Sequence, residues 1–117
     1  MTVKTKRVYE PLEPSDGFRL LVMRLWPRGV SKGAVHAWEP DLGPSRDLLT
    51  AYRRGKVGWE EFARRYTEEV RDKPDILKKV QSLEEEHGQV TLLCSCPQEG
   101  RCHRGVLKGL LEARPLS

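Results

Sequence analysis

Two apolar runs separated by a long stretch of helical pattern constrain the fold of this chain more than any other feature of its sequence. The first run, residues 18–25, is broken only by Arg19 and Arg24, and the second covers residues 90–94. Continuous apolar runs of this length are typical of strands that are buried on both faces of a sheet. A connection that contains helices joins such strands in parallel. The sequence therefore predicts an α/β fold with two central parallel strands.

Four helices are expected, three of them between the two runs. Ser45 is a favoured N-cap, and Pro74 is a favoured first-turn residue. The expected helical ranges are about 45–54, 59–71, 74–87 and 102–113. A further strand over residues 4–9 joins the first run by a loop of about eight residues, a length that favours antiparallel pairing. We expect a small, mostly parallel sheet of about three strands covered by about four helices. Residues 30–44 read as irregular, with Trp38 as a core anchor.

Length and composition narrow the function classes. The 117 residues fit one domain, 1–117, and a content of 38% hydrophobic and 32% charged residues is typical of a globular protein. No apolar run approaches the ~20 residues of a membrane span, and residues 1–7 lack the apolar segment of a signal peptide. Three cysteines, all within residues 94–102, suit a reducing compartment. We expect a cytoplasmic protein with no membrane partner; its oligomeric state is left open.

The segment from Cys94 to Arg104 concentrates the chemistry of the sequence. It follows the second apolar run as a loop with Pro and Gly, and it leads into the last expected helix. Ligands of parallel sheets bind outside the carboxyl ends of the strands, and a helix N-terminus favours anions. Arg101, His103 and Arg104 nevertheless crowd this helix start, where each cation opposes the helix dipole by roughly 0.3–1 kcal/mol. A bound anion, or a carboxylate from elsewhere in the fold, would offset that cost.

A second set of candidate residues leaves the first apolar run at the same edge of the expected sheet. Arg24 and Arg28 are candidates for a bidentate clamp on a phosphate or carboxylate, with a structural ion pair to an acid at the edge of the core as the alternative. Trp26 between them is a candidate for stacking on a planar ligand, with ordinary packing as the alternative. The expected anion-binding residues are Arg24, Arg28, Arg101 and Arg104. His103 is the expected acid/base, with Cys102 as a second catalytic candidate. We therefore expect a small anionic ligand, nucleotide-like ones included, and no cofactor.

The cysteines leave other interpretations open. Cations beside Cys102 lower the pKa of a thiol, although a buried, inert cysteine fits the same position. Cys96 and Arg101 have the Cys-x4-Arg spacing of a sulfurtransferase-like loop. Zinc binding by Cys94, Cys96, Cys102 and His103 is disfavoured, because adjacent Cys102 and His103 would struggle to ligate one ion, and no metal is expected. A nucleic-acid-associated module is a further alternative, which the formal charge of +4 permits, and so is a purely interaction-based role.

The sequence resembles a known family over nearly its whole length. The runs Arg7–Tyr9 and Asp16–Lys32, with the block Arg-Leu-Trp-Pro-Arg-Gly inside the second, are similar to the start of the YeaO-like branch of the family of domain of unknown function 488. The match continues through Trp38, Pro44, Ser45, Trp59–Phe62, Tyr66, Val90–Leu93 and Cys102–Arg104.

The resemblance implies a bacterial or archaeal α/β protein and supports the choice of site, without implying a reaction. Two positions depart from the family. Met23 stands where the family usually has Asp, so that a carboxylate beside Arg24 is missing. Cys102 stands where this branch often has Asn, which makes the expected role of His103 better supported than that of Cys102.

Overall fold

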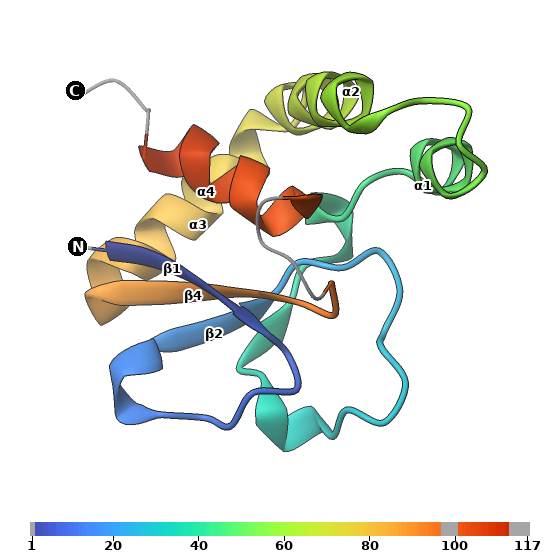
Figure 1. Cartoon of the computed structure of the whole chain (residues 1–117). Coiled ribbons are helices and arrows are strands. Elements are labelled where there is room, and N and C mark those ends of the chain that lie inside the picture. The colour runs from blue at the N-terminus through green and yellow to red at the C-terminus, as the bar shows by residue number, and fades with distance from the viewer. Residues whose placement is uncertain (1, 97–100, 113–117) are drawn as a thin grey trace.

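A computed structural model of the protein describes residues 2–96 and 101–112 (Figure 1). The strands are β1 (Thr2–Arg7), β2 (Phe18–Leu21), β3 (Ala37–Trp38) and β4 (Gln89–Cys94). The α-helices are α1 (Arg46–Arg53), α2 (Trp59–Arg71), α3 (Pro74–His87) and α4 (His103–Glu112). Short 3-10 helices lie at η1 (Pro14–Asp16), η2 (Lys32–Ala34) and η3 (Pro40–Leu42). Within the described ranges, no helix has both the length and the apolar character needed to cross a bilayer.

The four strands described form one parallel sheet in the order β1-β4-β2-β3. The predicted parallel pairing of the two apolar runs is confirmed, with Leu20 of β2 opposite Leu92 of β4. The prediction of an antiparallel first strand is wrong. β1 pairs with β4 rather than with the strand that follows it, so the connection through η1 crosses β4 instead of turning back as a hairpin. Thr91 of β4 donates to the carbonyl of Asp16 in η1, which holds this crossing against the sheet.

The predicted helices are confirmed to within about a residue, because capping and periodicity fix them locally. The hydroxyl of Ser45 accepts the Leu48 N–H at 3.2 Å and begins α1. Gly88 ends α3 with a φ of 79°, a left-handed conformation that glycine adopts without steric cost.

The stretch after β2 differs from the prediction. β2 ends at Leu21 rather than near residue 25, and the two-residue β3 lies in the segment that was expected to be irregular. Trp38 is not a core anchor: its side chain is 41% exposed, because it ends the edge strand β3. Its indole N–H donates to the Met23 carbonyl at 2.7 Å, so it still fastens β3 to the end of β2.

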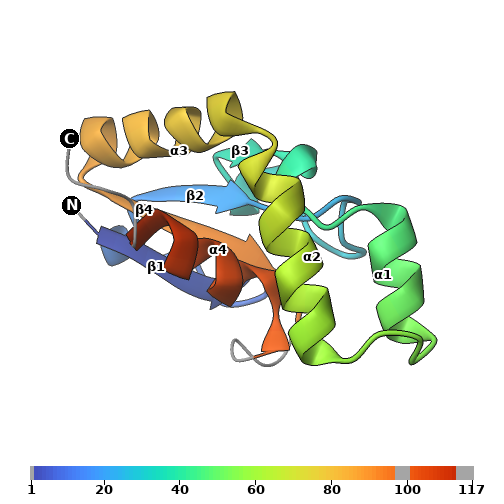
Figure 2. The ribbon, with the colours of Figure 1, turned by 90° about the horizontal axis from the view of Figure 1, so that it is seen from above.

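Helices cover one face of the sheet and loops cover the other. Figures 1 and 2 show α2, α3 and α4 on the same face, with α4 over β1 and β4, and α1 lying beyond one end. Leu20 and Leu92 belong to the core under the helices, whereas Leu21 and Leu93 belong to a smaller apolar cluster under the loops. This alternation follows from the two-residue period of a strand. It also determines which neighbours the residues at the carboxyl end of β4 meet.

Candidate functional site

Three thiols and an imidazole meet where β4 ends and α4 begins. Cys94 is the last residue of β4, Cys96 lies two residues further on, and Cys102 and His103 stand at the start of α4. The Cys94 Sγ lies 3.4 Å from the Cys96 Sγ and 3.9 Å from the His103 Nδ1, and the Cys102 Sγ lies 3.9 Å from the same nitrogen. These four ligand-type atoms all lie within 4.8 Å of one another. We call these four residues the thiol–histidine cluster.

His103 is fixed by contacts on both sides of its ring. The side chain is 5% exposed, its Nε2 contacts the Val22 carbonyl just beyond β2, and its ring meets Tyr66 edge-on at 5.4 Å. Because a carbonyl only accepts hydrogen bonds, Nε2 carries a proton and Nδ1 faces the sulfurs. Burial disfavours the charged ring, but hydrogen bonds to Cys94 and Cys96 outweigh it and raise the pKa of His103 to about 9. Direct acid/base action on a ligand would require one of these contacts to break.

The contact between Cys94 and Cys102 shifts the pKa values of the two thiols in opposite directions. The contact with Cys102, followed by that with Cys96, lowers the pKa of the Cys94 thiol far below its usual range. The same contact raises the pKa of Cys102, because a second thiolate beside the first is repelled. The sequence predicted that neighbouring cations would lower the pKa of Cys102. The Arg104 Nη1 does lie 3.7 Å from the Cys102 Sγ, but the contacts with Cys94 and Cys96 outweigh it, and the pKa is raised instead. Cys94 is the preferred thiolate of the cluster.

Arg104 lies against the cluster and is almost fully buried, at 4% exposure. Its Nη1 donates to the Cys96 carbonyl at 2.7 Å and lies 3.7 Å from the Cys102 Sγ. Its Nε is buried without a hydrogen-bond partner. Within the described ranges, the one other buried side-chain nitrogen or oxygen without a partner is the Nε of Arg7. Two unpaired guanidinium N–H groups thus lie near one end of β4.

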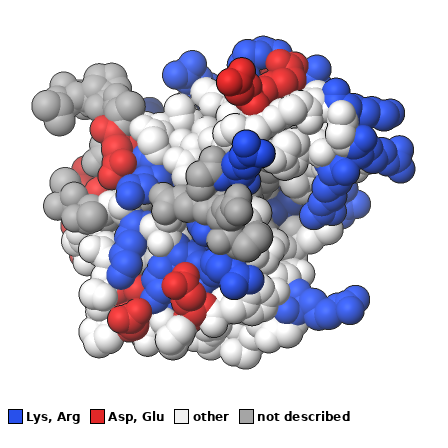
Figure 3. Space-filling view, in the orientation of Figure 1, with Lys and Arg blue, Asp and Glu red and all other residues white. Residues whose placement is uncertain are grey.

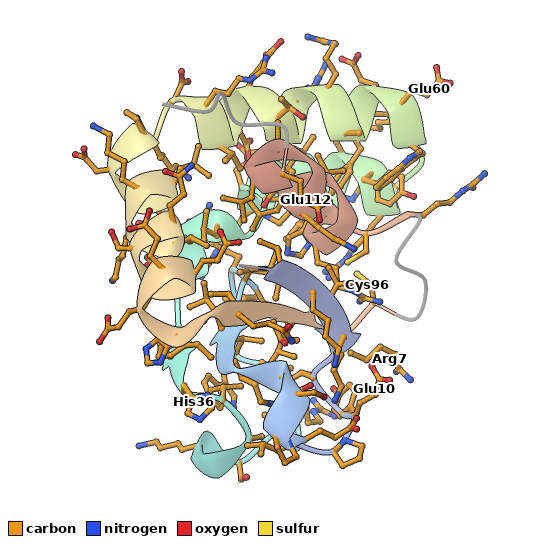
Figure 4. The ribbon with its side chains drawn as sticks, turned by 90° about the vertical axis from the view of Figure 1, so that its left-hand side faces the viewer. Arg7, Glu10, His36, Glu60, Cys96 and Glu112 are labelled. Carbon is orange, nitrogen blue, oxygen red and sulfur yellow. The ribbon has the colours of Figure 1, made fainter. Side chains whose placement is uncertain are left out.

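Arg7 reaches this edge from the neighbouring strand. It is the last residue of β1 and is paired with Cys94 in the register of the sheet, while its guanidinium lies 5.5 Å from the centre of the Tyr9 ring. Figure 4 shows Arg7 and Glu10 just below Cys96 at the same edge. The Glu10 carboxylate accepts the Arg7 backbone N–H at 2.6 Å and so closes the turn after β1.

The structure does not bring the other predicted anion-binding arginines into this cluster. Arg24 donates to the carbonyls of Gly43 and Pro44 and forms an ion pair with Asp41 at 3.0 Å, so it fastens the segment before α1. Arg28 is exposed. Arg101 is also exposed and lines a groove with the first turn of α2. Of the predicted site residues, Cys102, His103 and Arg104 lie together.

Trp26, the predicted stacking residue, belongs to a different hollow. It lines a groove of about 690 Å³ whose lining residues include no member of the thiol–histidine cluster. Its ring meets Trp38 edge-on at 5.5 Å, and its indole N–H donates to the Val30 carbonyl. An aromatic groove and a thiol–histidine cluster are therefore separate features of this molecule.

Arg7 and Cys94 were not predicted as anion-site or catalytic residues, although Cys94 entered the disfavoured zinc set. The sequence did contain a pattern that predicts the place of Cys94. Two-residue alternation puts Cys94 on the helix-covered face with Leu92, and thus under the start of α4. No such pattern predicts the place of Arg7, since its position depends on the pairing of β1 with β4. The interior of the Cys96–Arg101 loop, proposed as sulfurtransferase-like, lies outside the described residues.

Comparison with known proteins gives consistent family matches. A family model described as the active DUF488-N3 subclade matches residues 3–115. The uncharacterised protein Rv3073c of Mycobacterium tuberculosis is 36% identical over 116 residues, covering 96% of this chain and 95% of that protein. The uncharacterised protein YeaO of Escherichia coli K12 is 34% identical over 115 residues, covering 97% and 99%. No solved structure matches the chain.

Proposed function

Since this chain belongs to the DUF488 family, in its active DUF488-N3 subclade, we propose that it binds a small phosphate- or carboxylate-bearing molecule where β1 and β4 end. The observation that carries the proposal is the buried guanidinium of Arg104, whose Nε has no partner. An unpaired buried donor costs about 1–3 kcal/mol, and more for a charged group. An oxyanion that accepts this N–H would remove the cost.

The electrostatics of the edge favour such a ligand. Arg7 supplies a second unpaired guanidinium N–H from the strand next to β4. The first turn of α4 adds backbone N–H groups and the positive end of the helix dipole. Arg104 occupies this first turn, a position that opposes the dipole unless a negative group lies nearby. The Cys94 thiolate offsets part of this positive charge, and the proposed anion offsets the rest.

Cys96 is the member of the cluster that a ligand would meet first. Its side chain is half-buried, whereas Cys94, Cys102 and His103 are buried. The Arg104 Nη1 already holds the Cys96 carbonyl, so a ligand on the Arg104 Nε would lie close to this residue. The matching subclade is described as active, which is consistent with chemistry in this family, and exposure makes Cys96 the thiol that we propose to contact the ligand.

The nucleic-acid alternative has weaker support. On the face seen in Figure 3, Lys and Arg side chains gather over α1 and again near the middle, where Asp and Glu lie among them. A backbone-tracking surface would need a continuous stripe of cations. We therefore keep the small anion as the proposed ligand.

The test is a calorimetric titration of the protein with inorganic phosphate and with a nucleoside monophosphate. We expect one of these probes to bind the wild type, and Arg104→Gln to raise its Kd by about 10-fold or more, since a hydrogen bond to a charged group contributes about 1.5–3 kcal/mol. The matched control is Arg53→Gln, an exposed arginine of α1, for which the Kd stays within about twofold. Failure of the wild type to bind either probe, or equal affinity in a folded Arg104→Gln protein, would refute the proposal.

A further inference from the structure

We propose that the thiol–histidine cluster is a metal site for Zn²⁺, with Cys94, Cys96, Cys102 and His103 as its four ligands. This inference goes beyond the anion site, because Arg104 needs no metal to bind an oxyanion. It also reverses the expectation from the sequence, in which the spacing of these residues disfavoured zinc.

The distances between the ligand atoms are close to those of a tetrahedral zinc site. With Zn–S of about 2.3 Å and Zn–N of about 2.0–2.1 Å, the ligand atoms of such a site lie about 3.5–3.8 Å apart. The measured separations are 3.4 Å between the Cys94 and Cys96 sulfurs, and 3.9 Å from the His103 Nδ1 to the sulfurs of Cys94 and Cys102. The widest separation among the four atoms is at most 4.8 Å, so small side-chain rotations would close the site.

The position of Cys102 and His103 at the start of α4 answers the objection that two adjacent residues struggle to bind one ion. Cys102 stands immediately before the helix, and His103 is its first residue. Both side chains are buried against the same cluster, and the Cys102 Sγ and the His103 Nδ1 approach to 3.9 Å. Cys102 and His103, although adjacent in sequence, therefore direct their ligand atoms to one point. Their spacing in the sequence alone had argued against such an arrangement.

The orientation of His103 suits metal ligation. Zinc-binding histidines usually donate their second ring N–H to a carbonyl or carboxylate, which fixes the tautomer and aims the free nitrogen at the metal. The Nε2 of His103 contacts the Val22 carbonyl and the Nδ1 faces the sulfurs. Tyr66 packs edge-on against the ring and limits its rotation. The second contact that such a ligand requires is already in place.

Charge and softness favour zinc over harder cations. Three thiolates and one neutral imidazole around Zn²⁺ leave a net charge of −1, and the Arg104 guanidinium places an opposite charge beside the Cys102 Sγ through its Nη1, while its Nε stays without a partner. Ca²⁺ and Mg²⁺ prefer oxygen ligands, of which this set has none. Four protein ligands complete the coordination shell, which is the pattern of a closed, structural zinc site. Cys96, the half-buried ligand, is the one through which the ion enters and leaves.

The experiment begins with the full chain, reduced and stripped of metal, and titrates it with Co²⁺ and then with Zn²⁺. We expect intense visible bands of tetrahedral Co²⁺–thiolate at one ion per chain, displaced by Zn²⁺ with a Kd in the nanomolar range or below. Cys94→Ser should weaken Zn²⁺ binding roughly 100-fold or more, beyond the effect usual for an outer-shell partner. All three cysteines lie in the cluster, so the matched control is His87→Ala, at the exposed end of α3, which should bind as the wild type does.

A second measurement does not depend on how the variants fold. X-ray absorption at the zinc edge of the wild-type protein should give three sulfur ligands and one nitrogen ligand. A shell dominated by oxygen, absence of the cobalt bands, or equal affinities of wild type and folded Cys94→Ser would overturn the proposal. Phosphate binding is measured separately on the metal-free protein. Failure of phosphate to bind would then count against the anion site alone, and failure of Co²⁺ and Zn²⁺ to bind would count against the metal site alone.

Discussion

At the scale of single residues, Asp16 is the carboxylate that organises the loop-covered face of the sheet. It is fully buried and forms ion pairs with Lys6 at 3.1 Å, Arg19 at 2.5 Å and Lys4 at 3.3 Å. Burial opposes its ionisation, but the Glu13 backbone N–H and the three cations together hold the pKa of Asp16 far below its usual range. Burial likewise opposes the charge on Lys6, and the carboxylates beside it still raise the pKa of Lys6. The network is thus kept fully charged.

We predict that Asp16→Asn lowers the free energy of unfolding by about 3–5 kcal/mol, because it leaves two buried cations, Lys6 and Arg19, without their carboxylate. Urea denaturation followed by circular dichroism measures the loss. The control is Glu13→Gln, whose carboxylate also pairs with Lys6 but is 57% exposed, and which should cost less than about 1 kcal/mol.

The same proteins give the pH dependence of this network. The folded-state pKa of Asp16 is lowered, so the unfolded chain takes up this proton first as the pH falls. The stability due to Asp16 is complete above the unfolded pKa of about 3.9 and is lost progressively below it. The difference in the free energy of unfolding between the wild type and Asp16→Asn should therefore stay constant from neutral pH to about 5 and shrink below about 4. A difference of less than about 1 kcal/mol at neutral pH would contradict this account.

At the scale of elements, the approach of the chain to β2 depends on Gly17, between η1 and the strand. Its φ is 63°, and a Cβ placed on it would overlap the carbonyl group of Gln89, the first residue of β4. The backbone can therefore cross β4 and enter β2 beside it only where no side chain intervenes. The register of the central pair, Phe18 opposite Val90, follows from this close approach.

We predict that Gly17→Ala destabilises the protein by about 2 kcal/mol or more, since strain at a left-handed φ adds to a backbone overlap. Gly29→Ala is the matched control: its φ is 79°, but nothing lies within 4 Å of the added carbon, so only the conformational cost of about 1 kcal/mol remains. Equilibrium denaturation of both variants provides the comparison. Equal losses would show that the crossing at Gln89 is not tight.

Which elements could be predicted from the sequence depended on how local their causes are. The helices were predicted because caps such as Ser45 and periodic apolar faces lie within each segment. The direction of β1 was predicted wrongly, because the short loop after it suggested pairing with the next strand. β1 instead pairs with β4, which is distant in sequence. β3 is two residues long and carries no period. In the candidate site, Cys102, His103 and Arg104 share one helix start and were predicted, whereas Arg7 arrives through the non-local pairing.

At the scale of the whole molecule, the site lies at the carboxyl end of the central strand β4. The helix-covered and the loop-covered faces of the sheet meet at this end. β4 pairs with both β1 and β2, so its carboxyl end is bordered by Arg7 from one neighbour and by the Val22 carbonyl beyond the other. α4 packs over β1 and β4 and places His103 and Arg104 at that end (Figure 2). The parallel topology is therefore what brings thiols, imidazole and guanidinium together.

The most direct test of this account is a crystal structure of the protein grown with inorganic phosphate. The account predicts phosphate density at hydrogen-bond distance, about 3 Å, from the Arg104 Nε, beside Cys96 at the start of α4. A structure in which the Arg104 Nε is bonded to another protein group, with phosphate absent from this edge of the sheet, would contradict it.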